Sequence, residues 1–342
     1  MKLGLWGARA DNGGLAAMTH EFWRHMRPDR TMVIDLGPAG RGEAHLDRYP
    51  EADVTRGYND AITPEAITRW CKGLDVVYLA ETSYREDFCA RARELGVRTV
   101  LHAMPELWRA GDSDPDEVWV PTRWEVTRMP AGTRVVPVPV PTDRFPGIQR
   151  RRVGTFLHMQ APAFHDRNGT HDVVNALAHV EADTRVIFSG GEAPPPAVHN
   201  HYGARVEIDW RPGPTPNRED AYPGDADALL LPRRYAGLSL PMQEAASLGW
   251  PVVTTNLAPQ NEWVPPETMT PPRPLRDVKM VGGTFRVYGT DPAQLGATMT
   301  RLLREPETAE KASKASNAHA MAISWLAWAP TYRRLLEEIA AG

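Results

Sequence analysis

Residues 229–255, which read LLLPRRYAGLSLPMQEAASLGWPVVTT, constrain the fold more than any other segment of this chain. An apolar run ends at Pro232, a loop that contains Gly237 follows, and a short helix is predicted from about Ser239. The β-branched run at 252–255 then predicts a second strand. This order is typical of a parallel sheet. Its loop brings backbone N–H groups and a helix N-terminus to the carboxyl edge of the sheet, where phosphate groups bind well.

The same alternation of short apolar runs and helical patterns continues through the chain and restarts after residue 152. In the first part, we expect strands at 3–6, 31–36, 76–80, 99–102, 117–120 and 134–138, with helices at 15–26 and 86–95. In the second part, we expect strands at 153–159, 185–189, 206–210 and 228–231, with a helix at 169–180. The pattern predicts an α/β protein with two doubly wound parallel sheets.

A length of 342 residues fits two such domains. The polar segment 145–152 has neither helical nor strand periodicity and marks the boundary. We therefore expect domains at 1–148 and 149–322, followed by a C-terminal helix at 323–342 whose apolar stripe packs back on the first domain. The proline-rich segment 265–274 is expected to be an irregular connection.

Composition excludes several classes of protein. The net charge is −4, and both halves of the chain share the small excess of acids, so neither half as a whole attracts nucleic acid. A local basic groove is the alternative, because arginine is abundant. Cys71 and Cys89 are its only cysteines, which indicates a reducing, cytoplasmic setting and no disulfide framework. No apolar run reaches the length of a membrane span. We expect a cytoplasmic monomer.

Three arginines are candidates for binding phosphate. Arg233 and Arg234 stand where a predicted strand ends, and a planar guanidinium binds phosphate with two hydrogen bonds. The sequence leaves open which of the two does so, and a pair of solvated surface charges is the alternative. Arg167 stands just before a predicted helix, where a cation is unfavourable unless an anion is bound.

Backbone and carboxylate groups complete this candidate site in the second domain. The loop and the start of the predicted helix, Gly237, Leu238 and Ser239, offer N–H groups to an anion. Glu244 lies one turn into that helix, where a carboxylate can accept hydrogen bonds from two hydroxyl groups, as a ribose presents them. The alternative is an ordinary turn with a glycine at its bend.

The first domain has its own candidates. Gly13 and Gly14 follow the first strand, and glycines there let the backbone approach a ligand, although a tight turn is as good an explanation. Asp11 lies in the same loop and is a candidate for binding an acceptor, meaning a substrate with a hydroxyl group. Other candidates follow later strands. They are His102 for contact with a sugar, and Glu81, Tyr84 and Glu106 for binding an acceptor. The alternative for His102 is a buried histidine with a backbone partner, and for Glu81 and Tyr84 a helix-start acid beside a packed tyrosine.

Two metal-like patterns are discounted. Asp225-Ala226-Asp227 resembles a DxD metal motif but precedes a buried strand, so we interpret it as a loop. His199 and His201 lack the further ligands that a zinc site requires. We interpret neither pattern as a metal site.

Residues 236–244, AGLSLPMQE, resemble the C-terminal motif of the family-four retaining glycosyltransferases. That family has a loop E-G-F-G-L and a second glutamate after seven intervening residues. The second glutamate corresponds to Glu244, which the resemblance makes a ribose ligand. The first, which binds the donor sugar in the family, is replaced here by Ala236. This change places the identity of the sugar, and activity itself, in question.

The resemblance extends more loosely along the chain. Arg167-Asn168-Gly169 stands where the family has Lys-Gly on the diphosphate, while Gly13-Gly14 and His102 match elements that touch the diphosphate and the sugar. The segments ETSY, ARELGVRTVLHAMPELW, PTRWE and SWLAWAP look similar to small glycosyltransferases encoded by phages. Some of these modify hydroxymethylated DNA bases.

The resemblance implies a GT-B fold, in which two Rossmann-like domains face each other across a cleft. It also implies a nucleotide-diphosphate sugar as donor and metal-independent transfer with retention. The acceptor is a modified DNA base or a small hydroxylated molecule. A protein that binds nucleotide sugars without transferring them is the alternative function.

Overall fold

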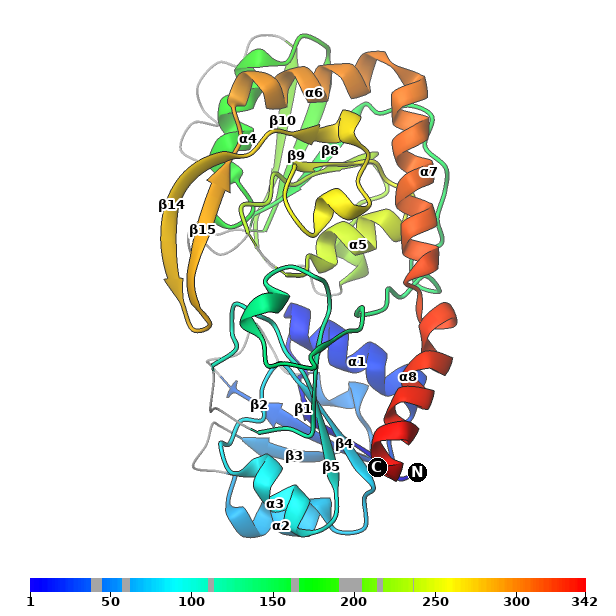
Figure 1. Ribbon diagram of the computed structural model, residues 1–342. Helices are drawn as coiled ribbons and strands as arrows, with labels where there is room; N and C mark the ends of the chain where they lie inside the picture. Colours follow the sequence, from blue (N-terminus) through cyan, green and yellow to red (C-terminus); the bar gives the residue numbers. More distant parts are fainter. Residues whose placement is uncertain are drawn as a thin grey trace. The chain divides into compact units, whose positions relative to one another are not determined.

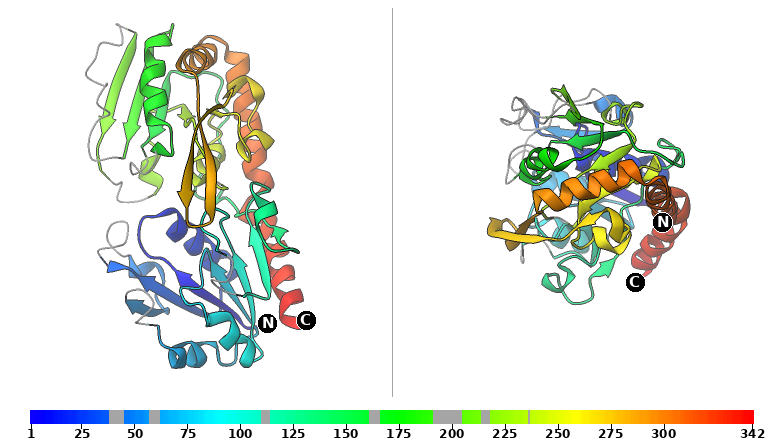
Figure 2. Two further views of the ribbon diagram at one scale, coloured as in Figure 1. Left: turned by 60° about the vertical axis from the view of Figure 1, so that its left-hand side comes forward. Right: turned by 90° about the horizontal axis from the view of Figure 1, so that it is seen from above.

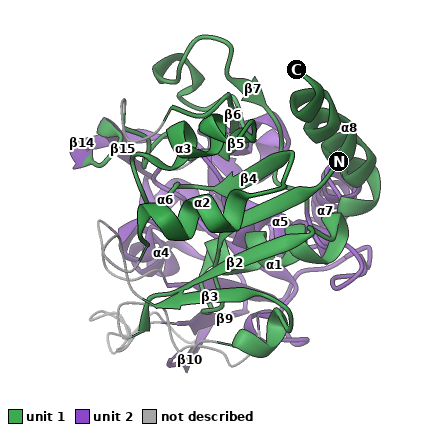
Figure 3. Cartoon of the chain, turned by 90° about the horizontal axis from the view of Figure 1, so that it is seen from below, with its two compact units in different colours: residues 1–139, 280–283, 325–342 green, residues 140–279, 284–324 purple. Residues whose placement is uncertain are grey.

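The computed structural model of the chain describes residues 1–37, 45–56, 62–109, 114–160, 166–190, 205–213, 218–235 and 237–342. It divides into two compact units, coloured separately in Figure 3. Unit 1 comprises Met1–Pro139, Met280–Gly283 and Trp325–Gly342, and unit 2 comprises Val140–Lys279 and Thr284–Ser324.

Unit 1 is built on a parallel sheet of seven strands in the order β3-β2-β1-β4-β5-β6-β7. Its strands are β1 (Leu3–Ala8), β2 (Arg30–Asp35), β3 (Asp53–Arg56), β4 (Val76–Ala80), β5 (Arg98–His102), β6 (Glu117–Val120) and β7 (Arg134–Val135). β1 and β4 are buried along their whole length, as expected for central strands covered on both faces.

Helices cover both faces of this sheet. α2 (Pro64–Cys71) packs against α3 (Phe88–Glu94), and α1 (Gly14–Met26) packs against the C-terminal helix α8 (Trp325–Ala341), which also contacts β4. Trp6 contributes to the apolar core beneath α2 and α3, while Tyr78 stacks on Phe22 of α1 with ring centroids 4.0 Å apart. The sheet is thus the middle layer of three, which can be followed in Figure 1.

Unit 2 repeats this plan with six parallel strands in the order β10-β9-β8-β11-β12-β13. The strands are β8 (Thr155–Met159), β9 (Thr184–Ser189), β10 (Val206–Arg211), β11 (Ala228–Leu230), β12 (Val252–Thr255) and β13 (Met269–Thr270). α4 (Thr170–Ala176) packs against α6 (Pro292–Arg304), and α5 (Leu240–Ser247) packs against α7 (Pro306–Ala322). Two apolar clusters, one with residues of α4 and α6 and one with residues of α5, fill the space next to the strands.

The predicted pair of doubly wound parallel sheets is therefore confirmed. The bounds of β4, β6 and β12 are those expected from the sequence. The proline-rich segment 265–274 differs from the expectation of an irregular connection. It contains β13, whose Met269 and Thr270 pair with Thr254 and Thr255, and the start of a hairpin. A two-residue strand is too short to show any periodicity in a sequence.

The hairpin, β14 (Arg273–Met280) and β15 (Gly283–Gly289), was not predicted. The left view in Figure 2 shows it as a separate two-stranded ribbon. Only β15 alternates clearly, with Phe285 and Val287 buried and Arg286 exposed between them. No helix within the described ranges is long and apolar enough to cross a membrane.

Candidate functional site

Each of the two sheets has a point at which the strand order reverses. In unit 1 this point lies between β1 and β4, and in unit 2 between β8 and β11. Ligands of doubly wound proteins bind beyond the carboxyl ends of the strands at such a switch point. In unit 2, the loops that leave β8 and β11 carry Arg167, Arg233 and Arg234. The three arginines predicted from the sequence to bind phosphate therefore lie on the two loops at the switch point of unit 2.

Arg233 connects these two loops in unit 2. Its guanidinium donates to Oδ1 of Asn168 over 2.9 Å and to the carbonyl oxygen of Leu238 over 3.1 Å. Asn168 in turn donates from Nδ2 to the carbonyl oxygen of Met159, the last residue of β8, over 2.8 Å. These bonds hold a buried arginine in one orientation at the carboxyl edge of the sheet. Sequence reasoning missed Asn168 as the residue that positions it.

Arg234 has a different environment from Arg233. Its guanidinium lies 3.0 Å from a carboxylate oxygen of Asp166 and 3.2 Å from one of Asp172. Its backbone N–H donates to the carbonyl oxygen of Arg167 over 3.0 Å. Two carboxylates of the same unit thus balance its charge. Between the two adjacent arginines, this geometry favours Arg233 as the phosphate ligand and gives Arg234 a structural role.

The start of α4 is not arranged as the sequence suggested. Asp166 accepts from the backbone N–H groups of Thr170 over 2.7 Å and of His171 over 3.2 Å. A carboxylate of the chain itself therefore caps this helix, so the start of α4 does not require a bound anion beside Arg167. Arg167 instead lies over the ring of Tyr235, with 5.2 Å between its Cζ atom and the ring centroid. This contact links Arg167 to the loop that follows β11.

Glu244, one turn into α5, has partners that the sequence did not indicate. Nε of Arg218 donates to one of its carboxylate oxygens, and the hydroxyl group of Tyr222 donates to the other. The Glu244 side chain is only 3% exposed. Burial acts to lower the pKa of Arg218, but attraction to Glu244 outweighs it and raises that pKa. Burial and the nearby carboxylate raise the pKa of Tyr222 well above its ordinary value.

The remaining candidates of unit 2 lie at the start of α5. Gly237 and Leu238 belong to the loop before the helix, and Ser239 is its N-cap residue. The Leu238 carbonyl oxygen is the one that accepts from Arg233, so the loop and the arginine are directly connected. Ala236 lies outside the described residues.

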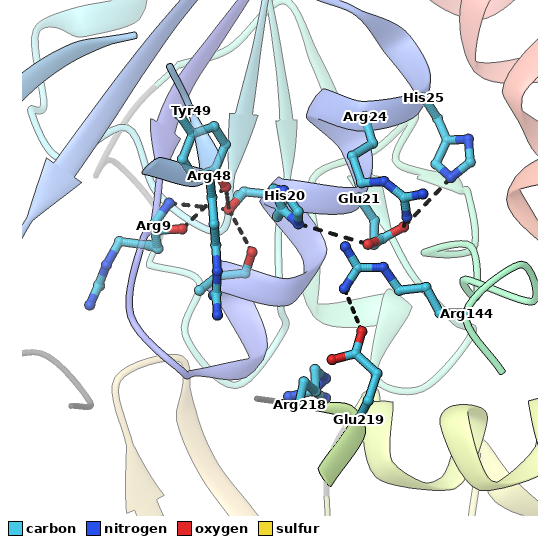
Figure 4. Close-up of polar contacts among 12 residues, drawn as sticks. Arg9, His20, Glu21, Arg24, His25, Arg48, Tyr49, Arg144, Arg218 and Glu219 are labelled. Atoms are coloured by element: carbon cyan, nitrogen blue, oxygen red, sulfur yellow. Dashed lines mark hydrogen bonds and ion pairs between the residues drawn. The ribbon is translucent and has the colours of Figure 1, made fainter. Parts of the chain in front are cut away.

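The switch point of unit 1 brings together the loops after β1 and β4. Asp11 accepts from the N–H of Gly13 over 2.9 Å and forms an ion pair with Arg9. Burial acts to lower the pKa of Arg9, but Tyr84 and Asp11 outweigh it and raise that pKa. The backbone of Arg9 has a partner as well: the Tyr49 hydroxyl donates to its carbonyl oxygen over 3.2 Å (Figure 4). Asp11 is thus already balanced by a cation, which the sequence did not indicate.

Glu81 and Tyr84, on the loop after β4, adopt left-handed backbone conformations with φ of 62° and 61°. Such conformations are costly for residues other than glycine and are frequent at functional sites. The Tyr84 ring leaves no room for a side chain at position 7, because a Cβ atom on Gly7 would lie 2.6 Å from it. Gly14 is the first residue of α1, and Gly13 is its N-cap residue. These four candidates therefore meet at one edge of the sheet.

The backbone of His102 ends β5 at the same edge, where its carbonyl oxygen accepts from the N–H of Glu81 over 3.0 Å, but its side chain turns into the core. Its side chain is completely buried, with Nδ1 hydrogen-bonded to the hydroxyl of Tyr78 over 2.7 Å and the ring packed near Trp119 and Tyr332. Burial lowers its pKa to about 3. All these neighbours belong to unit 1. This environment is that of a buried histidine, the alternative to contact with a sugar, although the hydrogen-bond partner is a tyrosine hydroxyl and not the backbone. Glu106 is also buried, and its carbonyl oxygen accepts from the N–H of Gly282 over 2.8 Å.

The carboxylates of the DxD-like segment have structural roles. Asp225 pairs with Arg185 and Arg211, each over 2.9 Å. Asp227 accepts from the N–H groups of Gly154 over 3.0 Å and Thr155 over 3.1 Å at the start of β8. These contacts agree with a loop that is tied to the sheet. His199 and His201 lie outside the described residues.

Comparison with known proteins defines the class of fold. No protein-family model matches the chain, and no curated protein sequence matches it. Among solved structures, HepE from Anabaena in complex with UDP and glucose is similar, with a TM-score of 0.70 and 12% identity over 99% of this chain and 100% of that one.

Two further solved structures agree with this result. Sucrose-phosphate synthase from Thermosynechococcus elongatus has a TM-score of 0.67 and 15% identity over 99% of each chain. The apo form of WaaB, a lipopolysaccharide outer core galactosyltransferase, has a TM-score of 0.66 and 12% identity over 97% of this chain and 98% of that one. The chain therefore has the GT-B fold of glycosyltransferases, as the sequence resemblance implied.

Proposed function

We propose that this protein is a retaining glycosyltransferase that moves a sugar from a nucleotide-diphosphate sugar to a hydroxyl group of an acceptor. The observation that carries the proposal is the position of Arg233. It is buried at the switch point of unit 2, held by Asn168 and by the carbonyl group that precedes the start of α5. A guanidinium fixed beside a helix N-terminus is suited to an anionic ligand.

This arrangement also suits the chemistry of sugar transfer. When the bond between sugar and diphosphate breaks, negative charge develops on the departing diphosphate. Preorganised donors aimed at such charge supply much of an enzyme's rate enhancement. In this protein they are Arg233, Arg167 and the backbone N–H groups of Leu238 and Ser239. Because these groups supply the positive charge, the proposed reaction needs no metal ion.

The two units have different roles in the proposal. Unit 2 binds the donor, with Glu244 on the ribose. Unit 1 binds the acceptor through the loops after β1 and β4, where Asp11, Glu81 and Tyr84 lie, together with Glu106. Retention follows from the family resemblance, by which the acceptor attacks from the side of the leaving group and the phosphate takes its proton. His102 and Arg234 have no part in the reaction.

The comparisons suggest which donor to test first. HepE has been solved with UDP, with UDP and glucose, and with UDP-glucose. UDP-glucose, ADP-glucose and GDP-mannose should be offered to the protein in turn, with binding followed by calorimetry and release of nucleotide diphosphate followed by chromatography. Binding with release of the diphosphate supports the proposal. Absence of binding by every donor and by the free diphosphates contradicts it.

The acceptor is proposed to be a hydroxymethylated base in DNA, on the strength of the resemblance to phage enzymes, with a small hydroxylated molecule as the alternative. Binding to DNA that contains 5-hydroxymethylcytosine distinguishes them. A DNA acceptor requires binding that weakens steeply with salt, because cations bound to the phosphates are released. Transfer to a free hydroxylated compound without DNA binding favours the alternative.

A second function is a protein that binds a nucleotide sugar without transferring it. Two observations favour it: Ala236 replaces the sugar-binding glutamate of the family motif, and both carboxylate oxygens of Glu244 already have partners. Under this alternative, donors bind, but neither transfer nor slow hydrolysis of the donor follows.

A further inference from the structure

Ser239 stands at the N-cap of α5 without capping the helix. Serine is among the residues most favoured at this position, because its hydroxyl accepts from a backbone N–H of the first turn. Here the Ser239 side chain makes no capping bond. Its carbonyl oxygen accepts from the N–H groups of Met242 and Gln243 over 3.0 Å and 3.1 Å, as an N-cap carbonyl normally does. The Oγ atom is buried and has no hydrogen-bond partner within the described part of the chain, and the residue is only 8% exposed.

Gln243 repeats this feature one turn later. It is also 8% exposed, and its Oε1 atom is buried without a hydrogen-bond partner among the described residues. Residues four apart share one face of a helix, and helical side chains lean toward the N-terminus. Gln243 therefore extends over the first turn of α5, on the same side as Ser239. Glu244, the next residue, projects about 100° away around the helix, toward Arg218 and Tyr222.

Two such atoms on one helix face point to a ligand. A buried polar group without a partner costs folding free energy, and most buried polar groups in proteins are satisfied. The guanidinium of Arg233 is bonded to the carbonyl oxygen of Leu238, directly before Ser239, so the pair adjoins the proposed diphosphate site. The carboxamide oxygen of Gln243 accepts hydrogen bonds, which phosphate oxygens cannot donate. A hydroxyl group both donates and accepts, so a sugar hydroxyl satisfies both side chains.

We infer that Ser239 and Gln243 bind hydroxyl groups of the transferred sugar and so determine which sugar the donor carries. This inference rests on the proposed function and adds a specificity role that the diphosphate and ribose ligands do not have. The Oγ atom of Ser239 and the Oε1 atom of Gln243 have no hydrogen-bond partner among the described residues of the free protein, and they acquire partners when the donor binds.

The test compares the variants Gln243→Met and Ser239→Ala with the wild-type protein. Methionine has a similar shape to glutamine but no strong hydrogen-bonding group, so each variant removes an unsatisfied polar atom. In the ligand-free protein we expect both variants to unfold at a higher temperature than the wild type. We expect the affinity for UDP-glucose to fall about fivefold to tenfold, the loss for one hydrogen bond, while the affinity for UDP stays the same. If the wild type prefers ADP-glucose or GDP-mannose, the matching diphosphate replaces UDP.

Ser247→Ala is the matched control on the same helix, because its Oγ already donates to the Gln243 carbonyl oxygen over 3.0 Å. We expect this control to leave the preference for nucleotide sugar over nucleotide unchanged. A lower unfolding temperature of ligand-free Gln243→Met would overturn the inference, since it would show that the side chain stabilises the free protein. An equal loss for UDP and UDP-glucose would overturn it as well, since the contact would then be to the nucleotide.

The two proposals fail in different ways. A wild-type protein that binds a nucleotide diphosphate but no nucleotide sugar overturns only the inference about Ser239 and Gln243. A wild-type protein that binds neither overturns the proposed function together with it.

Discussion

Arg218 forms an ion pair with Glu244, which lies one turn into α5, and the arginine Nε donates to the carboxylate. The glutamate side chain is 3% exposed and the arginine side chain 25% exposed. The carboxylate is therefore shielded from solvent, while the guanidinium is partly open to it. Tyr222 donates to the second oxygen of the same carboxylate. The proposed ribose ligand is thus held in one orientation before any nucleotide binds.

Replacing Glu244 tests that role. In Glu244→Ala we expect the affinity for nucleotide diphosphate to fall at least about tenfold, since two ribose hydroxyls lose their acceptor. We also expect unfolding free energy to fall by about 2–3 kcal/mol, because Arg218 is left without its carboxylate. Calorimetry and urea denaturation measure the two effects. Tyr222→Phe is the control: it should cost about 1 kcal/mol of stability and leave the affinity nearly unchanged. Unchanged affinity in Glu244→Ala would refute the ribose assignment.

The adjacent arginines offer a second test. We expect Arg233→Ala to lower kcat by about 100-fold or more and to weaken donor binding less, because charge on the leaving group is greatest in the transition state. Arg233→Lys should restore little, since a lysine cannot bond to two oxygens in a fixed plane.

Arg234→Ala is the matched control for position and charge. It leaves Asp166 and Asp172 without their shared cation, so we expect a loss of thermal stability with kcat largely kept in the protein that remains folded. Steady-state kinetics and thermal unfolding separate the two variants. Normal turnover by Arg233→Ala would remove that residue from the mechanism.

Stability should depend on pH through two buried histidines. Burial lowers the pKa of His158 to about 4 and that of His102 to about 3. Each would titrate near pH 6.5 in the unfolded chain. Below that pH the unfolded chain takes up protons that the native protein does not, so the unfolding free energy should fall between about pH 6.5 and pH 4. Each histidine contributes up to about 1.4 kcal/mol per pH unit.

His158→Asn tests this slope at one site. The ring Nδ1 of His158 donates to the Leu230 carbonyl oxygen over 2.8 Å, and Nε2 accepts from the Thr170 hydroxyl over 2.9 Å. Asparagine can keep the first bond without titrating. Urea denaturation at several pH values should give a flatter profile for the variant. An identical slope would show that His158 is protonated in the native protein over this range.

Metal independence is a fourth prediction. Arginine side chains and helix N–H groups supply the positive charge in the proposed site, so EDTA should leave the initial rate of transfer unchanged. Added magnesium or manganese should then raise the initial rate less than about twofold. A metal ion that acts as a Lewis acid stabilises the transition state by several kcal/mol, which would change the rate far more than this. A rate that disappears with EDTA and returns with one of these ions would contradict the proposed mechanism.

Local patterns in the sequence were sufficient to predict the layout of the protein. Short apolar runs separated by helical patterns predicted both parallel sheets, and the positions of Arg233, Gly237 and Glu244 after a buried strand placed them at a carboxyl edge. This reasoning succeeds because strand and helix periodicity are local properties, and parallel strands bring their carboxyl ends to one edge. The hairpin was missed because its first strand is exposed along most of its length and shows little alternation.

The contacts of each polar side chain, in contrast, depend on how the whole chain folds. The carboxylate that caps α4 comes from Asp166, the partners of Glu244 come from a loop more than twenty residues earlier, and Tyr332 of the C-terminal helix packs near His102 in the core. A strand-end histidine and an active-site histidine look alike in a sequence. They differ in whether a distant element covers them, and that depends on packing between segments far apart in the chain.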